Sequence, residues 1–170
     1  MTCSERGKIV EESFRKSLEN TLNKNGLKYT LTKTNFNEDV HKHIDFVLEY
    51  GDKKRSFDVK GKKKVNRSDE NEANSLHWIE LTNVNGRKGW LYGEATHIAF
   101  ETDEGFMLVK RRNLIELIDE KCTDEKIYNS EDTKNKEIYK KYNRKGRKDV
   151  IILVPNSDIE KIKEKFIFKI

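Results

Sequence analysis

Residues 43–62 read HIDFVLEYGDKKRSFDVKGK, and they hold the clearest strand pattern in the chain. On both sides of a Gly-Asp-Lys-Lys turn, large apolar side chains alternate with polar ones, which is typical of strands with one buried face. The stretch therefore predicts a β-hairpin. The face opposite the apolar one carries two acids and a lysine, Asp45, Asp58 and Lys60.

The spacing of apolar residues and the positions of turn residues also predict the elements in the rest of the chain. Residues 8–24 predict a helix, because apolar side chains recur at three- and four-residue steps and Asn25-Gly26 follows as a stop. The further predicted elements are strands at 27–34, 77–84 and 150–154, a hairpin of 96–102 with 106–111, a helix at 113–121, and a last helix capped by Ser157 or Asp158. Strand pairs interleaved with helices predict the α/β class, with a mixed central β-sheet flanked by helices.

The composition predicts one folded domain. A length of 170 residues is the usual size of a single domain, and 34% apolar residues suffice for a core although 38% are charged. Residues 123–149 nearly lack aliphatic side chains, so we expect a charged insertion there, either a mobile segment or a short helix ordered by a partner. No membrane span or secretion signal is expected, and two isolated cysteines indicate a reduced, cytoplasmic protein.

Asp45, Asp58 and Lys60 are residue types that phosphodiester hydrolysis needs. Carboxylates supply the hard oxygen ligands that magnesium prefers, and a lysine can orient water or offset charge on phosphoryl oxygens. The Asp-x-Lys pattern alone means little, since the chain contains it five times. Only the copy at Asp58 lies in an alternating strand, after another strand with an aspartate and after an amphipathic helix with glutamates.

With these residues in view, the chain resembles the PD-(D/E)XK nuclease superfamily, whose fold is called restriction-endonuclease-like. The resemblance covers about the first half of the chain and is nearest to the Holliday-junction-resolving and phage-type branches. The matching pieces are residues 7–11, 43–46 and 56–62, although Ile44 stands where the family's proline would be. The resemblance implies that Glu11, Asp45 and Asp58 hold Mg²⁺, for which Mn²⁺ would substitute, and that Lys60 assists the attacking water.

Several of these residues have an ordinary alternative explanation. Glu11 could be replaced by Glu12 as the helix acid, and either could simply favour a helix N-terminus. Asp45 could be solvated on an exposed sheet face. His43 and Glu80 are reserve candidates, because His43 is close to Asp45 and Glu80 alternates with Trp78.

The basic character of the chain favours a polyanionic partner. The net charge is +5 with a pI near 9.0, and basic residues crowd two segments that could line one groove. Lysines next to a strand can also be a guard against aggregation, and aromatic residues in the loop at 85–93 can simply pack beneath it. The candidate nucleic-acid-binding residues are Lys62, Lys63, Lys64, Arg87, Lys88, Arg144 and Arg147.

Together these features predict a magnesium-dependent endodeoxyribonuclease. The resemblance favours branched DNA as substrate, as in Holliday-junction resolution during recombination and repair, and paired cuts in a symmetric junction would suit a homodimer. It would act in the cytoplasm, or in the host cytoplasm if a phage encodes it. The alternatives are a restriction or defence nuclease on duplex DNA and a non-catalytic nucleic-acid-binding module.

Overall fold

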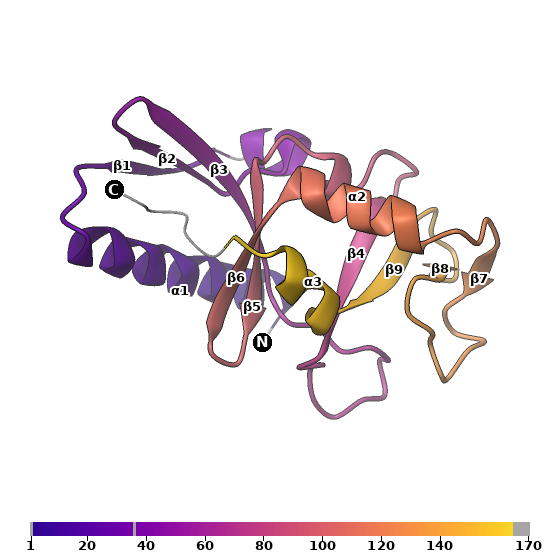
Figure 1. Cartoon of the computed structure of the whole chain (residues 1–170). Helices are drawn as coiled ribbons and strands as arrows, with labels where there is room; N and C mark the ends of the chain where they lie inside the picture. The colour runs from indigo at the N-terminus through magenta and orange to yellow at the C-terminus, as the bar shows by residue number, and fades with distance from the viewer. Residues whose placement is uncertain (1, 36, 165–170) are drawn as a thin grey trace. The chain divides into compact units, whose positions relative to one another are not determined.

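The computed structural model describes residues 2–35 and 37–164, and it is a mixed α/β structure (Figure 1). The chain forms two compact units, each drawn from separate stretches of sequence. The first unit comprises Met1–Gly61, Glu94–Lys110 and Lys163–Ile170, and the second comprises Lys62–Gly93 and Arg111–Ile162. Each unit has its own β-sheet, whereas the sequence predicted one central sheet over residues 1–170.

The first unit begins with helix α1, Cys3–Lys24, which starts earlier than the predicted residue 8. Its first turn is held by a capping box, in which the Thr2 side chain accepts the Glu5 N–H and the Glu5 side chain accepts the Thr2 N–H. One face of the helix is apolar and buried, as the sequence spacing predicted. That face consists of Val10, Phe14, Leu18 and Leu22.

The sheet of the first unit has five strands in the order β1-β2-β3-β5-β6. The strands are β1 Thr30–Lys33, β2 Phe46–Tyr50, β3 Lys53–Lys60, β5 His97–Thr102 and β6 Gly105–Lys110. Neighbours are antiparallel except β3 and β5, which are parallel. A π-helical turn, η1 Glu38–Lys42, lies between β1 and β2.

Helix α1 packs on this sheet through aromatic side chains. The Phe14 ring lies 5.4 Å from the Phe57 ring, 6.0 Å from Phe46 and 5.2 Å from Phe106, measured between centroids. Phe46 and Phe57 are partners in the β2–β3 register. The predicted hairpin and its apolar face are therefore confirmed, and this packing fixes the hairpin beneath α1.

The second unit contains a four-stranded sheet in the order β4-β9-β8-β7. The strands are β4 Leu76–Thr82, β7 Ile127–Asn129, β8 Lys141–Asn143 and β9 Val150–Pro155. The helical elements are η2 Trp90–Tyr92, α2 Arg111–Lys121 and α3 Asn156–Ile162. Pro155 is the last residue of β9, where the sequence predicted that it would follow the strand.

Residues 123–149, expected to be a charged insertion, contain strands β7 and β8. Tyr142 on β8 is buried, and its ring centroid lies 6.1 Å from that of Trp78 and 6.0 Å from that of Tyr128. Tyr128 and Tyr142 thus supply apolar contacts within this charged stretch. In the described part of the chain, no helix has the length and apolar character needed to cross a membrane.

Candidate active site

Asp45 lies immediately before β2, and its backbone and side chain contact the residues on either side of Asp58. The Asp45 N–H donates to the Phe57 carbonyl oxygen at 2.8 Å, and its carboxylate Oδ2 accepts the Val59 N–H at 2.6 Å. These bonds hold the carboxylate against β3, with only 6% of Asp45 exposed. The alternative that Asp45 is a solvated residue on an exposed sheet face is therefore wrong.

Asp58 and Lys60 lie two residues apart on β3, which the strand alternation places on one face. Lys60 Nζ is 2.7 Å from Asp58 Oδ1. Asp58 is only 2% exposed, and Lys60 is half-buried. The lysine ammonium group therefore contacts a carboxylate that is almost fully shielded from solvent. The acid and the cation that the sequence placed together do form an ion pair.

Burial is the largest influence on the ionisation of Asp45, and the negative charge of Asp58 is the next. Together they raise the pKa of Asp45 to about 8, although Lys60 and the Val59 N–H act in the opposite direction. Glu11 also contributes a smaller upward shift in the pKa of Asp45. A proton or a cation is therefore favoured between these groups at neutral pH.

Glu11 on α1 forms an ion pair with Lys33 on β1, with Lys33 Nζ 2.9 Å from Glu11 Oε2. The Glu11 side chain is 20% exposed, and its charge acts on Asp45. Lys33 was not among the residues singled out from the sequence. No local sequence signal indicated it, since the register that places Lys33 opposite Phe46, next to Asp45, is set by tertiary packing.

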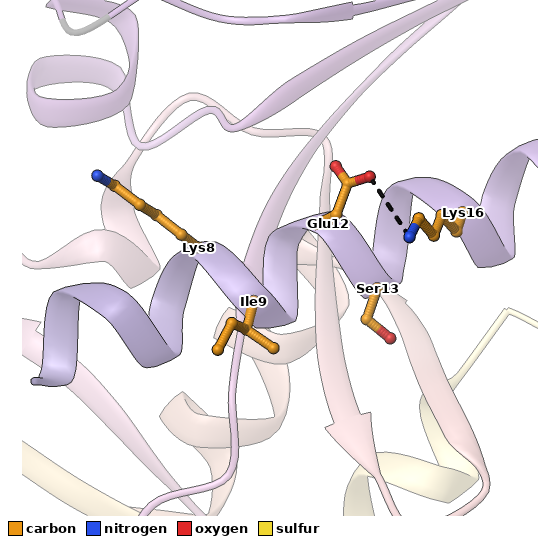
Figure 2. A pocket seen from close by; sticks show the side chains of 5 residues that line it. All are labelled: Lys8, Ile9, Glu12, Ser13 and Lys16. Carbon is orange, nitrogen blue, oxygen red and sulfur yellow. Dashed lines mark ion pairs between the residues drawn. The ribbon is translucent and has the colours of Figure 1, made fainter. Parts of the chain in front are cut away.

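Glu12, the alternative helix acid, has other partners. Its carboxylate contacts Arg15 at 2.5 Å and Lys16 at 4.0 Å, its side chain is 48% exposed, and Arg15 holds its pKa below the usual value. Figure 2 shows Glu12 beside Lys16 on the part of α1 that lines a surface pocket, together with Lys8, Ile9 and Ser13. Glu11 acts on the pKa of Asp45, whereas Glu12 is paired with Arg15, which favours Glu11 as the helix acid of this site.

The donor atoms at Asp45 and Asp58 fit the chemistry of a magnesium site. Both offer hard carboxylate oxygens in a buried place where like charges repel, and a divalent cation relieves such repulsion. Glu11 is the third acid within electrostatic reach, held on Lys33. Within residues 2–35 and 37–164, no three His, Cys, Asp or Glu side chains are gathered closely enough to form a complete metal-binding group.

The predicted nucleic-acid-binding residues all belong to the second unit, as does Glu80 on β4. Two hydrogen bonds hold the lysine segment 62–64. Lys62 Nζ donates to Asn74 Oδ1, and Trp78 Nε1 donates to the Lys64 carbonyl oxygen. Arg144 bonds the buried carboxylate of Asp149. Arg87, Lys88 and Arg147 are exposed. His43 lies in the first unit with a positive φ of 54°.

Comparison of the chain with protein-family models, with curated proteins and with solved structures found no match. The site is therefore described by its own geometry: two buried carboxylates, a lysine bonded to one of them, and a glutamate on the neighbouring helix.

Proposed function

We propose that the chain is a magnesium-dependent endodeoxyribonuclease with its catalytic site in the first unit. The observation that carries the proposal is the buried Asp45 and Asp58 pair with Lys60 Nζ 2.7 Å from Asp58. Burying two carboxylates together costs free energy, and such a cost is characteristic of sites whose chemistry needs the charges. Asp58 is less exposed than the aspartates of the other four Asp-x-Lys copies, Asp52, Asp119, Asp124 and Asp132.

Each residue has a role that its surroundings support. Asp45, Asp58 and Glu11 would hold Mg²⁺, or Mn²⁺ in its place, and the bound ion would polarise the phosphate and make a water more acidic. Lys60 orients that water or offsets negative charge on the phosphoryl oxygens. Because Glu11 Oε2 is bonded to Lys33, the lysine competes with a cation for the negative charge of Glu11.

The preference for branched DNA, such as a four-way junction, rests on the resemblance to junction-resolving nucleases. A homodimer would suit paired cuts in such a junction, and the cytoplasm is the proposed location. The second candidate is a restriction or defence nuclease on linear duplex DNA. Cleavage of a labelled junction beside a duplex of the same sequence separates the two, since equal cutting of both would contradict junction specificity.

A non-catalytic DNA-binding module is the third candidate, and site variants test it. Asp58→Asn and Lys60→Met should each lower magnesium-dependent cleavage about 100-fold or more. Both should leave DNA binding in EDTA within a factor of about two, because neither removes a contact outside the site.

The start of the hairpin's second strand offers a matched control, since Asp52 in the turn and Lys54 on β3 repeat the Asp-x-Lys pattern in an exposed position. Asp52→Asn and Lys54→Met should leave cleavage unchanged. Unchanged cleavage in the Asp58 and Lys60 variants would refute the assigned site, and wild-type protein that binds DNA without cutting it would favour the non-catalytic module.

A further inference from the structure

Two basic loops of the second unit lie side by side. One follows β4 and the other precedes β9, and these strands are antiparallel neighbours with Thr82 opposite Val150. The Lys148 N–H donates to the Val84 carbonyl oxygen at 3.4 Å, and a Cβ placed on Gly86 would lie 3.3 Å from the Lys148 side chain. The basic segments are far apart in the sequence but adjacent in the fold.

Each loop is ordered by its own hydrogen bonds. In the first loop, the Asn83 side-chain oxygen accepts the N–H groups of Asn85 and Arg87, both at 3.0 Å. The Asn83 N–H also donates to the Arg87 carbonyl oxygen at 2.8 Å. Binding a ligand here would cost little conformational entropy, because the backbone is already fixed.

The second loop is ordered through Arg144 and the buried Asp149. Arg144 contacts the Asp149 carboxylate with its guanidinium group, and its backbone N–H donates to Asp149 Oδ1 at 3.1 Å. Arg144 therefore supports the loop rather than offering its charge to a ligand. These contacts join the start of the loop to the residue before β9.

Five cationic side chains are left exposed on the two loops, and we call them the basic loop surface. Among the described residues they form no ion pair. Two lysines close to these loops in the sequence differ, because Lys140 is paired with Asp124 and Lys141 with Glu125. The basic loop surface consists of Arg87, Lys88, Lys145, Arg147 and Lys148.

We infer that the basic loop surface binds the phosphodiester backbone of duplex DNA. Arginine and lysine side chains that contact phosphates release condensed counterions, so such a surface gives affinity that falls steeply with salt. The choice of DNA rests on the proposed nuclease function. The surface itself rests on the adjacency of the loops, their order, and the exposed cations.

The test compares two double variants, Arg87→Ala with Lys88→Ala and Arg147→Ala with Lys148→Ala, by fluorescence anisotropy on a labelled duplex in EDTA. Each should weaken binding about tenfold and reduce the slope of log affinity against log salt by roughly one to two. Their melting temperatures should match the wild type, because the side chains are exposed. The control is Lys53→Ala with Lys54→Ala, which removes the same charge from the exposed start of β3.

The outcomes separate this inference from the proposed function. Unchanged affinity in both loop variants, or an equal loss in the control, would overturn the basic loop surface even if the protein cuts DNA. Tight binding to an RNA duplex of the same sequence without binding to DNA would overturn the choice of DNA. Loop-dependent DNA binding without any magnesium-dependent cleavage would leave the surface standing and remove the nuclease.

Discussion

Asp45 gives the stability of the protein a pH dependence opposite to that of most aspartates. Its folded pKa is raised to about 8 by burial and by Asp58, whereas in an unfolded chain it is near 3.9. Between these values the unfolded chain has lost the proton and the folded chain keeps it. The contribution of Asp45 to stability is therefore complete below pH 4 and is lost as the pH rises toward 8.

Asp45→Asn should remove this dependence. The amide stays neutral and its oxygen can still accept the Val59 N–H. Thermal unfolding in EDTA between pH 5 and pH 9 should show the variant close to wild type at the acidic end and more stable at the alkaline end. The wild type should lose at most about 1.4 kcal/mol per pH unit more than the variant. Parallel pH profiles would contradict the assignment.

Lys33 should compete with a divalent cation for Glu11, since its ammonium group lies 2.9 Å from the Glu11 carboxylate. Lys33→Met should therefore tighten Mn²⁺ binding several-fold in calorimetry, because the cation no longer has to displace the lysine. Lys28→Met removes an exposed charge shortly before the same strand and serves as the control. Equal tightening in both variants would show a general charge effect instead of competition at Glu11.

For individual residues, the sequence was informative where the position of a side chain follows from strand alternation. Asp58 and Lys60 could be placed together because residues two apart share a face of a strand. The burial of Asp45 could not be predicted, because it depends on the Val59 N–H of a different strand. Nor could the Glu11–Lys33 pair, which joins residues 22 positions apart through tertiary packing.

Helix α1 approaches the end of β3 closely at Gly61. A Cβ at this position would lie 3.2 Å from Val10 Cγ2 and 3.4 Å from Glu101 Oε2. Gly61→Val should therefore overpack the contact and lower the free energy of unfolding by about 1–3 kcal/mol. It should also weaken Mn²⁺ binding, because Val10 is adjacent to Glu11 on the helix.

At Gly7, on the same helix, we expect a larger side chain to raise the free energy of unfolding. Nothing lies within 4 Å of a Cβ placed there, so Gly7→Ala should stabilise the protein by roughly 0.5–1 kcal/mol through helix propensity. Urea denaturation measures both changes. Equal effects of the two substitutions would contradict the close approach of α1 to β3.

Helices and strands with a clear repeat of apolar residues were predicted well. Elements whose formation depends on neighbouring segments of the fold were not. The α1 stripe and the β2–β3 hairpin follow from local pattern alone, although the capping box extends α1 to Cys3. Strands β7 and β8 have three residues each, too few for alternation to be recognised. The parallel pairing of β3 with β5 joins segments separated by all of β4 and its loops, which no local signal encodes.

Over the whole molecule, the chain passes repeatedly between its two units, so neither is a contiguous piece. Residues 1–61 contain α1 and β1–β3 but lack β5 and β6, which complete their sheet. The fragment 1–61 should therefore be unfolded, with poorly dispersed amide resonances, while the full chain should fold. A well-dispersed spectrum for the fragment would show that the first unit does not need its later strands.

The division into two units was not predictable from length or composition, because a chain of 170 residues is the ordinary size of one domain. The mixed α/β class was predictable, since it depends only on which elements alternate along the chain. What the sequence could not supply is which strands share a sheet, because register and partner are set by long-range packing.

The interleaved path has a consequence for synthesis on the ribosome. At about 5–20 residues per second, strand β5 leaves the ribosome seconds after β3, so the edge of β3 that will pair with β5 waits without its neighbour. An uncovered apolar edge would recruit other nascent chains, but charged residues on an edge discourage such pairing. Asp58 and Lys60 lie on β3, the strand whose edge is uncovered at this stage. The residues proposed for catalysis would therefore also discourage aggregation of the incompletely synthesised protein.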